Sequence, residues 1–394
     1  MACGGSEPEV AGLVRWLVDE GRFAPDTGEL LRLLSERLVA LGVPLARATT
    51  HIRTLHPEFR GIMRLWRPGQ TTEEITPRHG IEVHLAYQNS PLQYVSERRE
   101  WLDRRTDDPE AADLPMLAEL RREGITHYVM APMIFSDGAV NAVSWATGAP
   151  GGFSGRDLRL LRAAAGPLEL ILEAKALRRI SSELLATYVG RDPANRIIAG
   201  AVQRGDVERI RAAILLTDLR GFTALADALP GERVIDLVNL YFDCVVPAVA
   251  AEGGEVLKFI GDGVLSVFRV DGGSARTACT AALRAARAAL DTLAEARRSD
   301  PLGGVPLHMG VALHYGEIAY GNVGSGSRLD FTAIGRDVNF VERLERLCGP
   351  IERPLLMSAE FAAMLGDAVF EIGHFDFRGF RQRRAVFGLV EDGA

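Results

Sequence analysis

Apolar and polar residues repeat with two different periods along the first half of the chain. Apolar side chains that recur every three or four positions predict helices at residues 9–20, 27–40, 115–123 and 154–188. Short apolar or alternating runs predict strands at residues 61–66, 82–86, 93–95, 126–135 and 140–146. The last two runs flank Ser136-Asp137-Gly138, a typical hairpin turn. This order of elements predicts a small α+β domain over residues 1–175.

The second half has sharper boundaries and predicts a second α/β domain over residues 209–394. Helices are expected at residues 224–251, with a break at Pro230-Gly231, and at 273–298 and 337–347. Strands are expected at residues 212–217, 255–260, 264–268, 307–314, 317–323 and 330–334, followed by a strand, a helix and two strands. The runs 307–314 and 317–323 are interpreted as a hairpin. Residues 176–208 then form a helical linker between the two domains.

Composition excludes several classes of protein. With 394 residues, 47% hydrophobic and 25% charged, the chain can bury more than one core and is not a disordered chain. A net charge of −7 gives no basic footprint, so nucleic acid and anionic membranes are poor partners. No run of about 18 apolar residues and no leader pattern is visible. We therefore expect a soluble, cytoplasmic protein.

The first domain resembles a GAF-type sensor domain, most clearly over HYVMAPMIFSDGAVNAVSWATGAPGGFSGRDLRLLRAAAGPLELIL. The resemblance is one of pattern and includes no sharp motif. It implies either a small-molecule ligand on one face of the sheet or a role in dimerisation. His84 and His127 are candidates for ligand contacts, with a structural histidine as the alternative.

Two aspartates stand beside turns in the second domain and suggest a site for cations. Asp218 ends an apolar strand and Asp262 lies in the turn of FIGDGV. Carboxylates from neighbouring strand ends form the oxygen-rich sites that Mg²⁺ and Mn²⁺ prefer. Phe222 and Thr223 follow at the start of a helix, where free N–H groups suit phosphate. By spacing alone, aspartates at turns are more often caps and turn formers than metal ligands.

Four segments of the second domain resemble successive signatures of the class III nucleotide cyclases. They are LTDLRGFTALAD, GGEVLKFIGDGVLSVF, GEIAYGNVGSGSRLDFTAIGRDVNFVERLE and FRGFRQRRAVFGLV. The resemblance spans roughly residues 209–390 and implies a ferredoxin-like βαββαβ fold. It also implies that Asp218, Asp262 and the Leu219 carbonyl bind two divalent ions, Mg²⁺ or Mn²⁺, for in-line attack of the ribose 3′-hydroxyl on the α-phosphorus.

The resemblance assigns further residues to the substrate. Asn339 and Arg343, four apart and so on one helix face, match the pair that positions the ribose and stabilises the transition state. Arg378 stands where the family usually has a lysine that reaches the triphosphate. An arginine can still bind phosphate through two parallel N–H···O hydrogen bonds.

Base selection follows from Lys258 and Thr332, which match the purine-selecting pair. Of the 45 basic residues only Lys175 and Lys258 are lysines, and this scarcity suggests that lysine is kept where arginine will not serve. An ammonium can donate to adenine N1, and a threonine oxygen can accept from the adenine amino group. The pair should therefore favour ATP over GTP by about one to two orders of magnitude.

The chain carries both halves of the family's composite site, so the resemblance implies a homodimer with two equivalent sites. The leading hypothesis is an adenylate cyclase that makes 3′,5′-cyclic AMP and pyrophosphate from ATP under control of the first domain. Two alternatives remain open. One is a guanylate or mixed-specificity cyclase, and the other is a cyclase fold that only binds nucleotide or mediates dimerisation.

Overall fold

The structure of the chain is a computed structural model. It describes residues 6–55, 59–77, 88–270, 272–299, 305, 307–366 and 369–390. The chain divides into two compact units, Met1–Leu184 and Leu185–Ala394. The first unit is mixed helix and sheet, and so is the second, in agreement with the predicted α+β class. The predicted boundaries at residues 175 and 208 lie on either side of this division.

The first unit is built on a six-stranded antiparallel sheet. Its strands are β1 (Arg47–Arg53), β2 (Gly61–Trp66), β3 (Glu73–Ile75), β4 (Leu102–Arg105), β5 (His127–Ile134) and β6 (Val140–Thr147), in the order β3-β2-β1-β6-β5-β4. Its helices are α1 (Ser6–Asp19), α2 (Thr27–Ala40), α3 (Pro91–Arg98), α4 (Pro115–Arg122) and α5 (Gly155–Val189). Two short 3₁₀ turns, Gly21–Phe23 and Pro109–Asp113, complete the unit.

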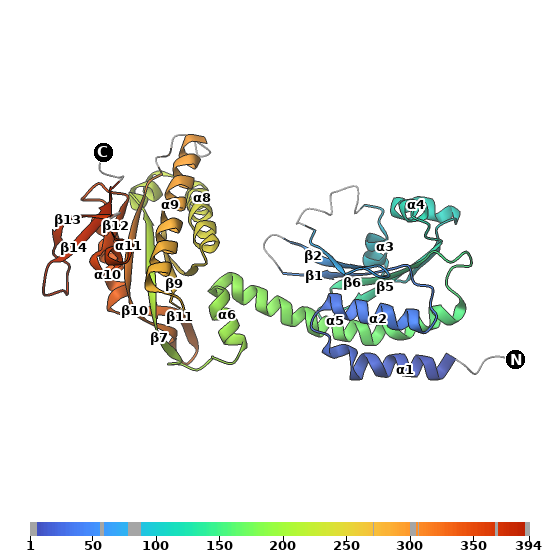
Figure 1. The fold of residues 1–394 in the computed structure, drawn as a ribbon. Helices are drawn as coiled ribbons and strands as arrows, with labels where there is room; N and C mark the ends of the chain where they lie inside the picture. Colours follow the sequence, from blue (N-terminus) through green and yellow to red (C-terminus); the bar gives the residue numbers. More distant parts are fainter. Residues whose placement is uncertain are drawn as a thin grey trace. The chain divides into compact units, whose positions relative to one another are not determined.

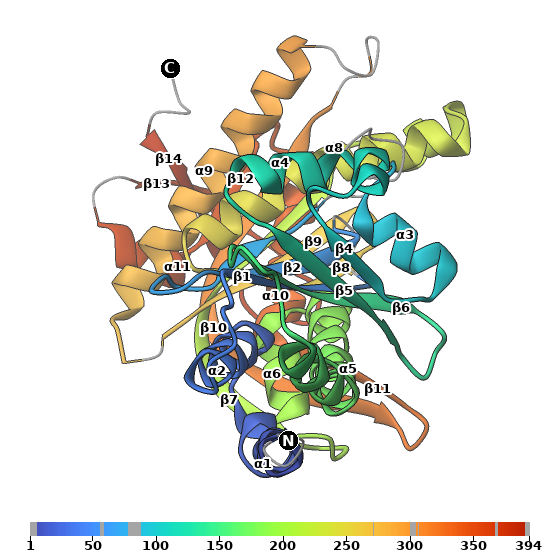
Figure 2. The same ribbon diagram turned by 90° about the vertical axis from the view of Figure 1, so that its right-hand side faces the viewer.

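Helices cover both faces of this sheet (Figures 1 and 2). Helices α1, α2 and α5 pack on one face, where Leu34, Trp145 and Leu168 belong to the same buried core. Helices α3 and α4 lie on the opposite face, where Val95 and Leu117 pack in a smaller core. Each face therefore has its own apolar layer.

The helix predictions agree with the structure, but one predicted strand is wrong. Residues 93–95 lie within helix α3, because Ser90 caps its N-terminus by accepting from the Gln93 amide at 3.1 Å and Pro91 occupies the first turn. Strand β1 was not predicted, because its sequence RATTHIR contains two apolar residues among five polar ones. The expected strand at residues 82–86 lies outside the described residues, as does His84.

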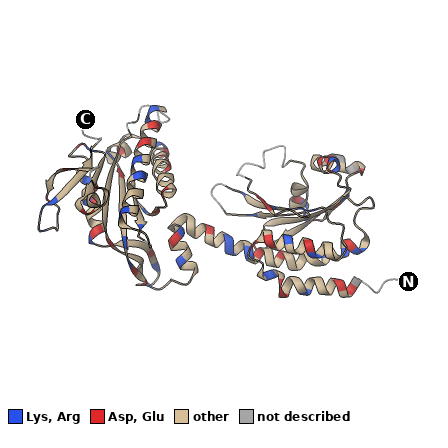
Figure 3. Cartoon of the chain, viewed as in Figure 1, with Lys and Arg blue, Asp and Glu red and all other residues tan. Residues whose placement is uncertain are grey.

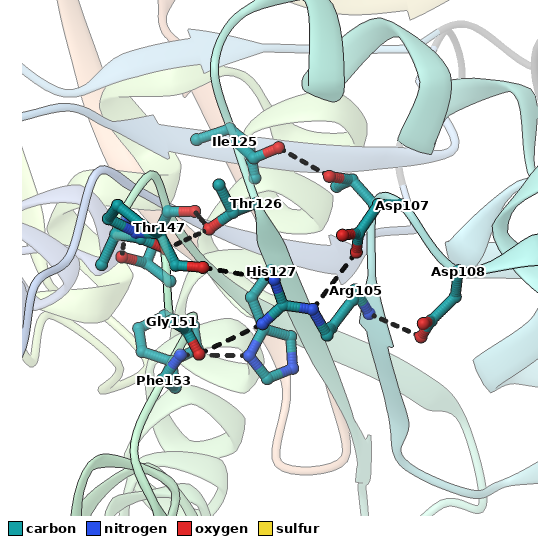
Figure 4. A network of polar contacts seen from close by, with 12 residues as sticks. Arg105, Asp107, Asp108, Ile125, Thr126, His127, Thr147, Gly151 and Phe153 are labelled. Atoms are coloured by element: carbon teal, nitrogen blue, oxygen red, sulfur yellow. Dashed lines mark hydrogen bonds and ion pairs between the residues drawn. The ribbon is translucent and has the colours of Figure 1, made fainter.

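His127 is a structural histidine in this fold (Figure 4). Its ring is buried, and its Nε2 lies 2.7 Å from Asp103 Oδ1. Its Nδ1 accepts a hydrogen bond from the Phe153 amide at 3.1 Å. Because Nδ1 accepts, Nε2 must carry the proton that is donated to Asp103. Both nitrogens are thus used to fasten β5 to β4 and to the segment before α5, and the ligand-contact alternative for His127 is not supported.

The second unit is built on an eight-stranded sheet with the order β13-β14-β12-β10-β7-β9-β8, and β11 pairs with β10. The strands are β7 (Val207–Leu219), β8 (Glu255–Ile260), β9 (Gly263–Arg269), β10 (Met309–Ser325), β11 (Arg328–Ile334), β12 (Leu355–Ser358), β13 (Val369–Phe375) and β14 (Arg384–Leu389). The helices are α6 (Arg191–Ile198), α7 (Phe222–Ala228), α8 (Gly231–Ala251), α9 (Ala275–Ser299), α10 (Arg336–Leu347) and α11 (Ala359–Leu365). The series β7-α8-β8-β9-α9-β10 has the βαββαβ order that the sequence led us to expect.

One predicted hairpin is a single strand. Residues 307–314 and 317–323 both belong to β10, which pairs with β7 from Met309 opposite Leu219 to Gly321 opposite Val207. Gly316 does not form a turn, and a Cβ there would collide with the Asp337 carboxylate. The glycine is needed for this close approach and not for chain reversal. The actual hairpin joins β10 to β11 (Figure 2).

Helix α8 forms part of the core of the second unit and runs through Pro247 to Ala251. Leu237, Tyr241 and Val245 pack against the small buried face of α9, which is rich in alanine. Among the described residues α8 is the one helix long and apolar enough, with mean hydropathy 1.7, to cross a membrane. In the view of Figure 3, acidic and basic residues alternate along the outer helices.

Candidate active site

Two predicted metal ligands meet at one end of the second sheet. Asp218 is the second-last residue of β7, and Asp262 lies in the turn between β8 and β9. Strands β7 and β9 pair directly, with Thr217 opposite Val264, so the two aspartates become neighbours. Asp262 Oδ2 accepts a hydrogen bond from the Leu219 amide at 3.1 Å. This bond holds one carboxylate against the end of β7.

The turn between β8 and β9 uses glycine on both sides of Asp262. Gly261 has a φ of 63°, a left-handed conformation that suits glycine. A Cβ at Gly263 would lie 3.3 Å from Asp218 Oδ1. Glycine at this position therefore leaves the approach to the Asp218 carboxylate open.

The two carboxyl groups lie within hydrogen-bonding contact and share a partly buried environment. Burial, and next the negative charge of Asp262, raise the pKa of Asp218 to about 7. Glu345 of α10 adds to the same effect, and burial raises its own pKa as well. The unit therefore gathers negative charge at this end of the sheet.

This arrangement fits a divalent cation. Two carboxylates in contact repel one another when both are ionised, and a cation between them removes that repulsion. Oxygen ligands of this kind suit Mg²⁺ and Mn²⁺. Within the described ranges no group of three or more His, Cys, Asp and Glu side chains forms a metal-binding cluster. The protein ligands would thus be Asp218 and Asp262, with the Leu219 carbonyl remaining a prediction.

Lys258 and Thr332 lie on two strands that the fold brings close together. Lys258 is on β8, and its ammonium forms an ion pair with Asp330 on β11. Thr332 is buried two residues farther along β11, so it shares a strand face with Asp330. The predicted purine-selecting lysine is therefore held on the Thr332 side of the unit by a neighbour that was not predicted.

Asn339 and Arg343 occupy one face of α10, one helical turn apart. Asn339 is exposed and Arg343 is half-buried. The Arg343 guanidinium lies 5.8 Å from the Phe380 ring, and a Cβ at Gly379 would lie 3.4 Å from its Nη1. The turn that carries the exposed Arg378 thus packs beside Arg343.

Aromatic side chains hold this turn on α10. Phe340 contacts the rings of Phe377 and Phe380, each at a centroid distance of 5.0 Å. Because these two rings flank Arg378 in sequence, the turn is anchored on both sides. The turn that carries Arg378 thus lies next to Arg343 on α10, and the role of Asn339, Arg343 and Arg378 toward a substrate remains a prediction.

Phe222 and Thr223 lie at the start of α7, directly after the β7 end that carries Asp218. Phe222 packs partly against the core, and Thr223 is exposed. Gly221 has a φ of 70° and turns the chain from β7 into the helix. Both residues are near Asp218 in sequence, and their contact with phosphate remains a prediction.

Helix α10 carries Glu345 and the Asn339–Arg343 pair on different faces. Glu345, whose charge acts on the aspartate pair, is separated around α10 by about 120° from Asn339 and by about 160° from Arg343, at about 100° per residue. Asn339 and Arg343 thus face away from the side of α10 that is turned to Asp218. Over the described residues, no hydrogen bond or ion pair joins either aspartate to Lys258, Thr332, Asn339 or Arg343.

Sequence reasoning missed Glu345 and Asp330. Both left a signal. Glu345 falls in the apolar stripe of α10 formed by Val338, Val341 and Cys348, at spacings of three and four, where a carboxylate is out of place unless it has a role. Asp330 is two residues from Thr332, on the same face of a strand.

With this geometry in place, the chain can be compared with known proteins. Residues 207–382 match the family model described as the adenylate and guanylate cyclase catalytic domain. The second unit therefore carries a class III adenylate/guanylate cyclase catalytic domain. The match does not extend into the first unit, so the GAF-like interpretation of that unit stays a prediction.

Relatives match over the same half of the chain. An adenylate cyclase of Anabaena cylindrica is 34% identical over 149 residues, which are 37% of this chain and 29% of that protein. Adenylate cyclase 1 of Rhizobium meliloti is 30% identical over 164 residues, 41% of this chain and 24% of that protein. An uncharacterized protein of Mycobacterium tuberculosis is 33% identical over 178 residues. The matched segment spans about a third of the relatives' length or less, for example 32% of the mycobacterial protein.

Among solved structures, the adenylyl cyclase CyaB from P. aeruginosa is 27% identical. The superposition covers 47% of this chain and 95% of that chain, with a TM-score of 0.43.

Proposed function

We propose that the protein is an adenylate cyclase that converts ATP to 3′,5′-cyclic AMP and pyrophosphate. The observation that carries the proposal is the contact between Asp218 and Asp262, with a raised pKa at Asp218, inside a segment that matches the cyclase catalytic domain. In the reaction the ribose 3′-oxygen bonds to the α-phosphorus and loses its proton. The bond from that phosphorus to the β-phosphate oxygen breaks, and pyrophosphate leaves.

The residues of the site have separate tasks in this proposal. Asp218, Asp262 and the Leu219 carbonyl would hold two divalent ions, Mg²⁺ or Mn²⁺, which when bound supply Lewis acidity to the 3′-hydroxyl and the triphosphate. Asn339 orients the ribose through its amide group. Arg343 and Arg378 donate hydrogen bonds to the phosphate oxygens, where negative charge grows as pyrophosphate leaves.

Lys258 and Thr332 select the base in this proposal. The Lys258 ammonium donates to adenine N1, and the Thr332 hydroxyl accepts from the adenine amino group. Guanine carries a donor at N1, which opposes the ammonium, and an acceptor, O6, in place of the amino group that would donate to Thr332. A guanylate or mixed-specificity cyclase is the second candidate, and this donor pattern disfavours it.

Two copies of the chain are needed to complete each site. The opposite faces of α10 support this proposal, because Asn339 and Arg343 point away from the aspartate pair of their own chain. A second copy related by a twofold axis would bring the aspartates of one chain to the Asn339 group of the other, and the reverse. Exposed Leu170 and Leu177 on α5, seven residues apart, are consistent with a helix pair between copies.

The first unit is proposed to regulate the second. Helix α5 leaves the core of the first unit and continues to Val189, and α6 then packs on the second unit. Within that unit the Asp192 amide donates to Glu255 Oε1 at 3.0 Å, and Glu255 stands three residues before Lys258 on β8. A change carried along α5 would thus reach the strand that holds Lys258.

Product formation by the purified full-length protein tests the function. ATP and GTP are supplied separately, each with Mg²⁺ and with Mn²⁺, beside an Asp262→Asn variant. Cyclic AMP from the wild type and a loss of at least about 100-fold in Asp262→Asn are expected. Asp291→Asn, an exposed aspartate on α9, is the matched control and should keep full activity.

Three outcomes would contradict the proposal. Cyclic GMP as the main product would favour the guanylate cyclase. Equal cyclic AMP from the wild type and Asp262→Asn would remove the metal site from the mechanism. No cyclic product from either the full chain or residues 185–394 would favour a module that binds nucleotide without reacting.

A further inference from the structure

The first unit contains a cavity of about 280 Å³ that the catalytic proposal does not use. It lies at the sheet face that carries α3 and α4, over strands β1, β2 and β5. Its volume is close to the lower limit of roughly 300 Å³ for small-molecule sites in proteins. The space therefore suits a compact molecule and not a nucleotide.

Apolar side chains form most of the cavity wall. Met63 comes from β2 and Ile75 from the paired position of β3, while Met130 comes from β5, Leu92 from α3 and Met116 from α4. Methionine side chains adapt to ligands of different shape because they are unbranched and flexible. This wall favours a hydrocarbon body.

The polar part of the wall is basic. Arg47 and Arg53 come from β1, and Arg60 immediately precedes β2. Arg47 is largely buried, and its Nε has no hydrogen-bond partner among the described residues. Burial lowers the pKa of Arg47, a sign that its charge lies in a poorly solvated place. A buried guanidinium without a full set of acceptors is costly unless an anion is supplied.

His51 adds a polar group without adding charge. Burial, and next the positive charge of Arg47, lower the pKa of His51 to about 4, so the ring is neutral at pH 7. Its Nε2 lies 3.0 Å from Thr49 Oγ1, which in turn lies 2.6 Å from Ser144 Oγ. The buried positive charge on this face is thus concentrated on Arg47.

Acidic groups are kept out of the cavity. Within the described ranges no Asp or Glu side chain lines it. Glu73, on the same face of β3, is paired with Arg67 at 3.8 Å. Glu74 points to the opposite face, where it pairs with Arg64 and with Arg179 of α5. The electrostatic field inside is therefore positive.

We propose that this cavity binds a small carboxylic acid in its ionised form, with the carboxylate on Arg47 and the hydrocarbon body against the methionines. A planar carboxylate matches the guanidinium fork. The carboxylate compensates the charge of Arg47, which burial penalises. Arg53, exposed at the mouth, attracts the anion from solvent. The site is independent of the cyclase reaction.

Binding to the intact full-length protein tests this site with a defined probe set. Hexanoate is compared with hexanamide and hexylammonium at matched ionic strength, by calorimetry and by the thermal shift of tryptophan fluorescence. All four tryptophans, at positions 16, 66, 101 and 145, belong to the first unit, so the signal reports on that unit alone. Hexanoate should bind and raise the melting temperature, and the other two should bind at least about tenfold more weakly.

Three variants separate charge from folding. Arg47→Gln should weaken hexanoate binding at least about tenfold, and Arg47→Lys should restore part of it. Arg53→Gln, at an exposed position, should weaken binding by a smaller factor without lowering the melting temperature. Arg159→Gln, an exposed arginine on α5 away from the cavity, is the control and should bind as the wild type does.

The proposal is wrong if hexanamide binds as tightly as hexanoate, since the arginines would then contribute nothing. It is equally wrong if hexylammonium is preferred, or if Arg47→Gln and Arg53→Gln both bind hexanoate like the wild type. Because the readout is binding and not cyclic nucleotide, failure here leaves the catalytic proposal untouched.

Discussion

Both units place titratable groups beside a sheet, but with opposite charge. The first unit sets Arg47 and His51 in a cavity that no described Asp or Glu side chain lines, whereas the second gathers Asp218, Asp262 and Glu345 at a sheet end. Burial penalises the charged form in both places, so it lowers the pKa of the bases and raises that of the acids. The first arrangement calls for an anion and the second for a cation.

The two places also differ in completeness. All residues that line the cavity come from one copy of the first unit. In the second unit, α10 turns Glu345 toward the aspartates and Asn339 away from them. The difference matters for the two proposals, because ligand binding in the first unit would need one copy, whereas the proposed catalytic site would need two.

The largest expected effect comes from mixing two inactive variants. Asp218→Ala and Asn339→Ala damage different halves of the site, so each homodimer has no intact site. Random exchange makes half of the dimers mixed, each with one intact site of two, so activity should recover to about a quarter of wild type. Cyclic AMP formation after co-refolding or co-expression measures it. If the mixture stays as inactive as its components, the sites are not shared between copies.

The next effect is on the pH dependence of stability in the first unit. His51 has a pKa near 4 in the folded state and about 6.5 when unfolded, so the unfolded chain binds more protons between these values. The free energy of unfolding should therefore fall by up to about 3 kcal/mol as the pH drops from 7.5 to 4.

Urea unfolding followed by tryptophan fluorescence measures this dependence. His51→Gln, which cannot titrate, should flatten it, whatever its effect on absolute stability. An identical slope in the variant would show that His51 is not held neutral. Saturating hexanoate should also flatten the slope, because a nearby carboxylate favours the protonated ring.

The smallest effect concerns base choice in the second unit. Lys258→Gln should reduce the ratio of kcat/KM for ATP over GTP by about tenfold. The reason is that a neutral amide, which can donate or accept a hydrogen bond, replaces the ammonium that only donates to adenine N1. Asp330→Asn should reduce it about threefold, because the ion pair that directs the Lys258 ammonium is lost while Thr332 remains. Initial rates with each nucleotide measure both ratios.

The control for base choice is the other lysine of the chain. Lys175 lies on α5 and donates to the Ala24 carbonyl, so Lys175→Gln should leave the nucleotide ratio unchanged. An unchanged ratio in Lys258→Gln would remove the lysine from base recognition. A ratio that moves in Lys175→Gln would show that the first unit acts on base choice.

Some helices and strands could be predicted from the sequence and others could not. Residues 27–40 form α2 as the apolar period predicted, because Asp26 also caps that helix through the Gly28 and Glu29 amides. The residue pattern led to a wrong strand prediction at residues 93–95, which belong to helix α3 and follow its N-cap, Ser90. The pattern also led to a wrong hairpin prediction at β10. Gly316 suggested a turn, but it lies within the strand and allows the close approach of Asp337. A run of three residues does not distinguish a strand from a helix, and a single glycine does not distinguish a turn from a close contact within a strand.

The sequence by itself determined the chemistry that is available. Its motifs specify two aspartates beside glycine turns, an asparagine and an arginine on one helix face, and a lysine in a chain that has two. These features are local, since each rests on residue types and spacings within one segment.

Tertiary structure alone decided which groups meet. The contact of Asp218 with Asp262 depends on β7 pairing with β9, and the ion pair of Lys258 with Asp330 joins residues 72 positions apart. The buried places of Glu345 and Arg47 likewise depend on the sheet and helices around them. Burial and charge proximity depend on residues far apart in the sequence, so the pKa shifts and the cavity beside Arg47 arise only when the sheets form.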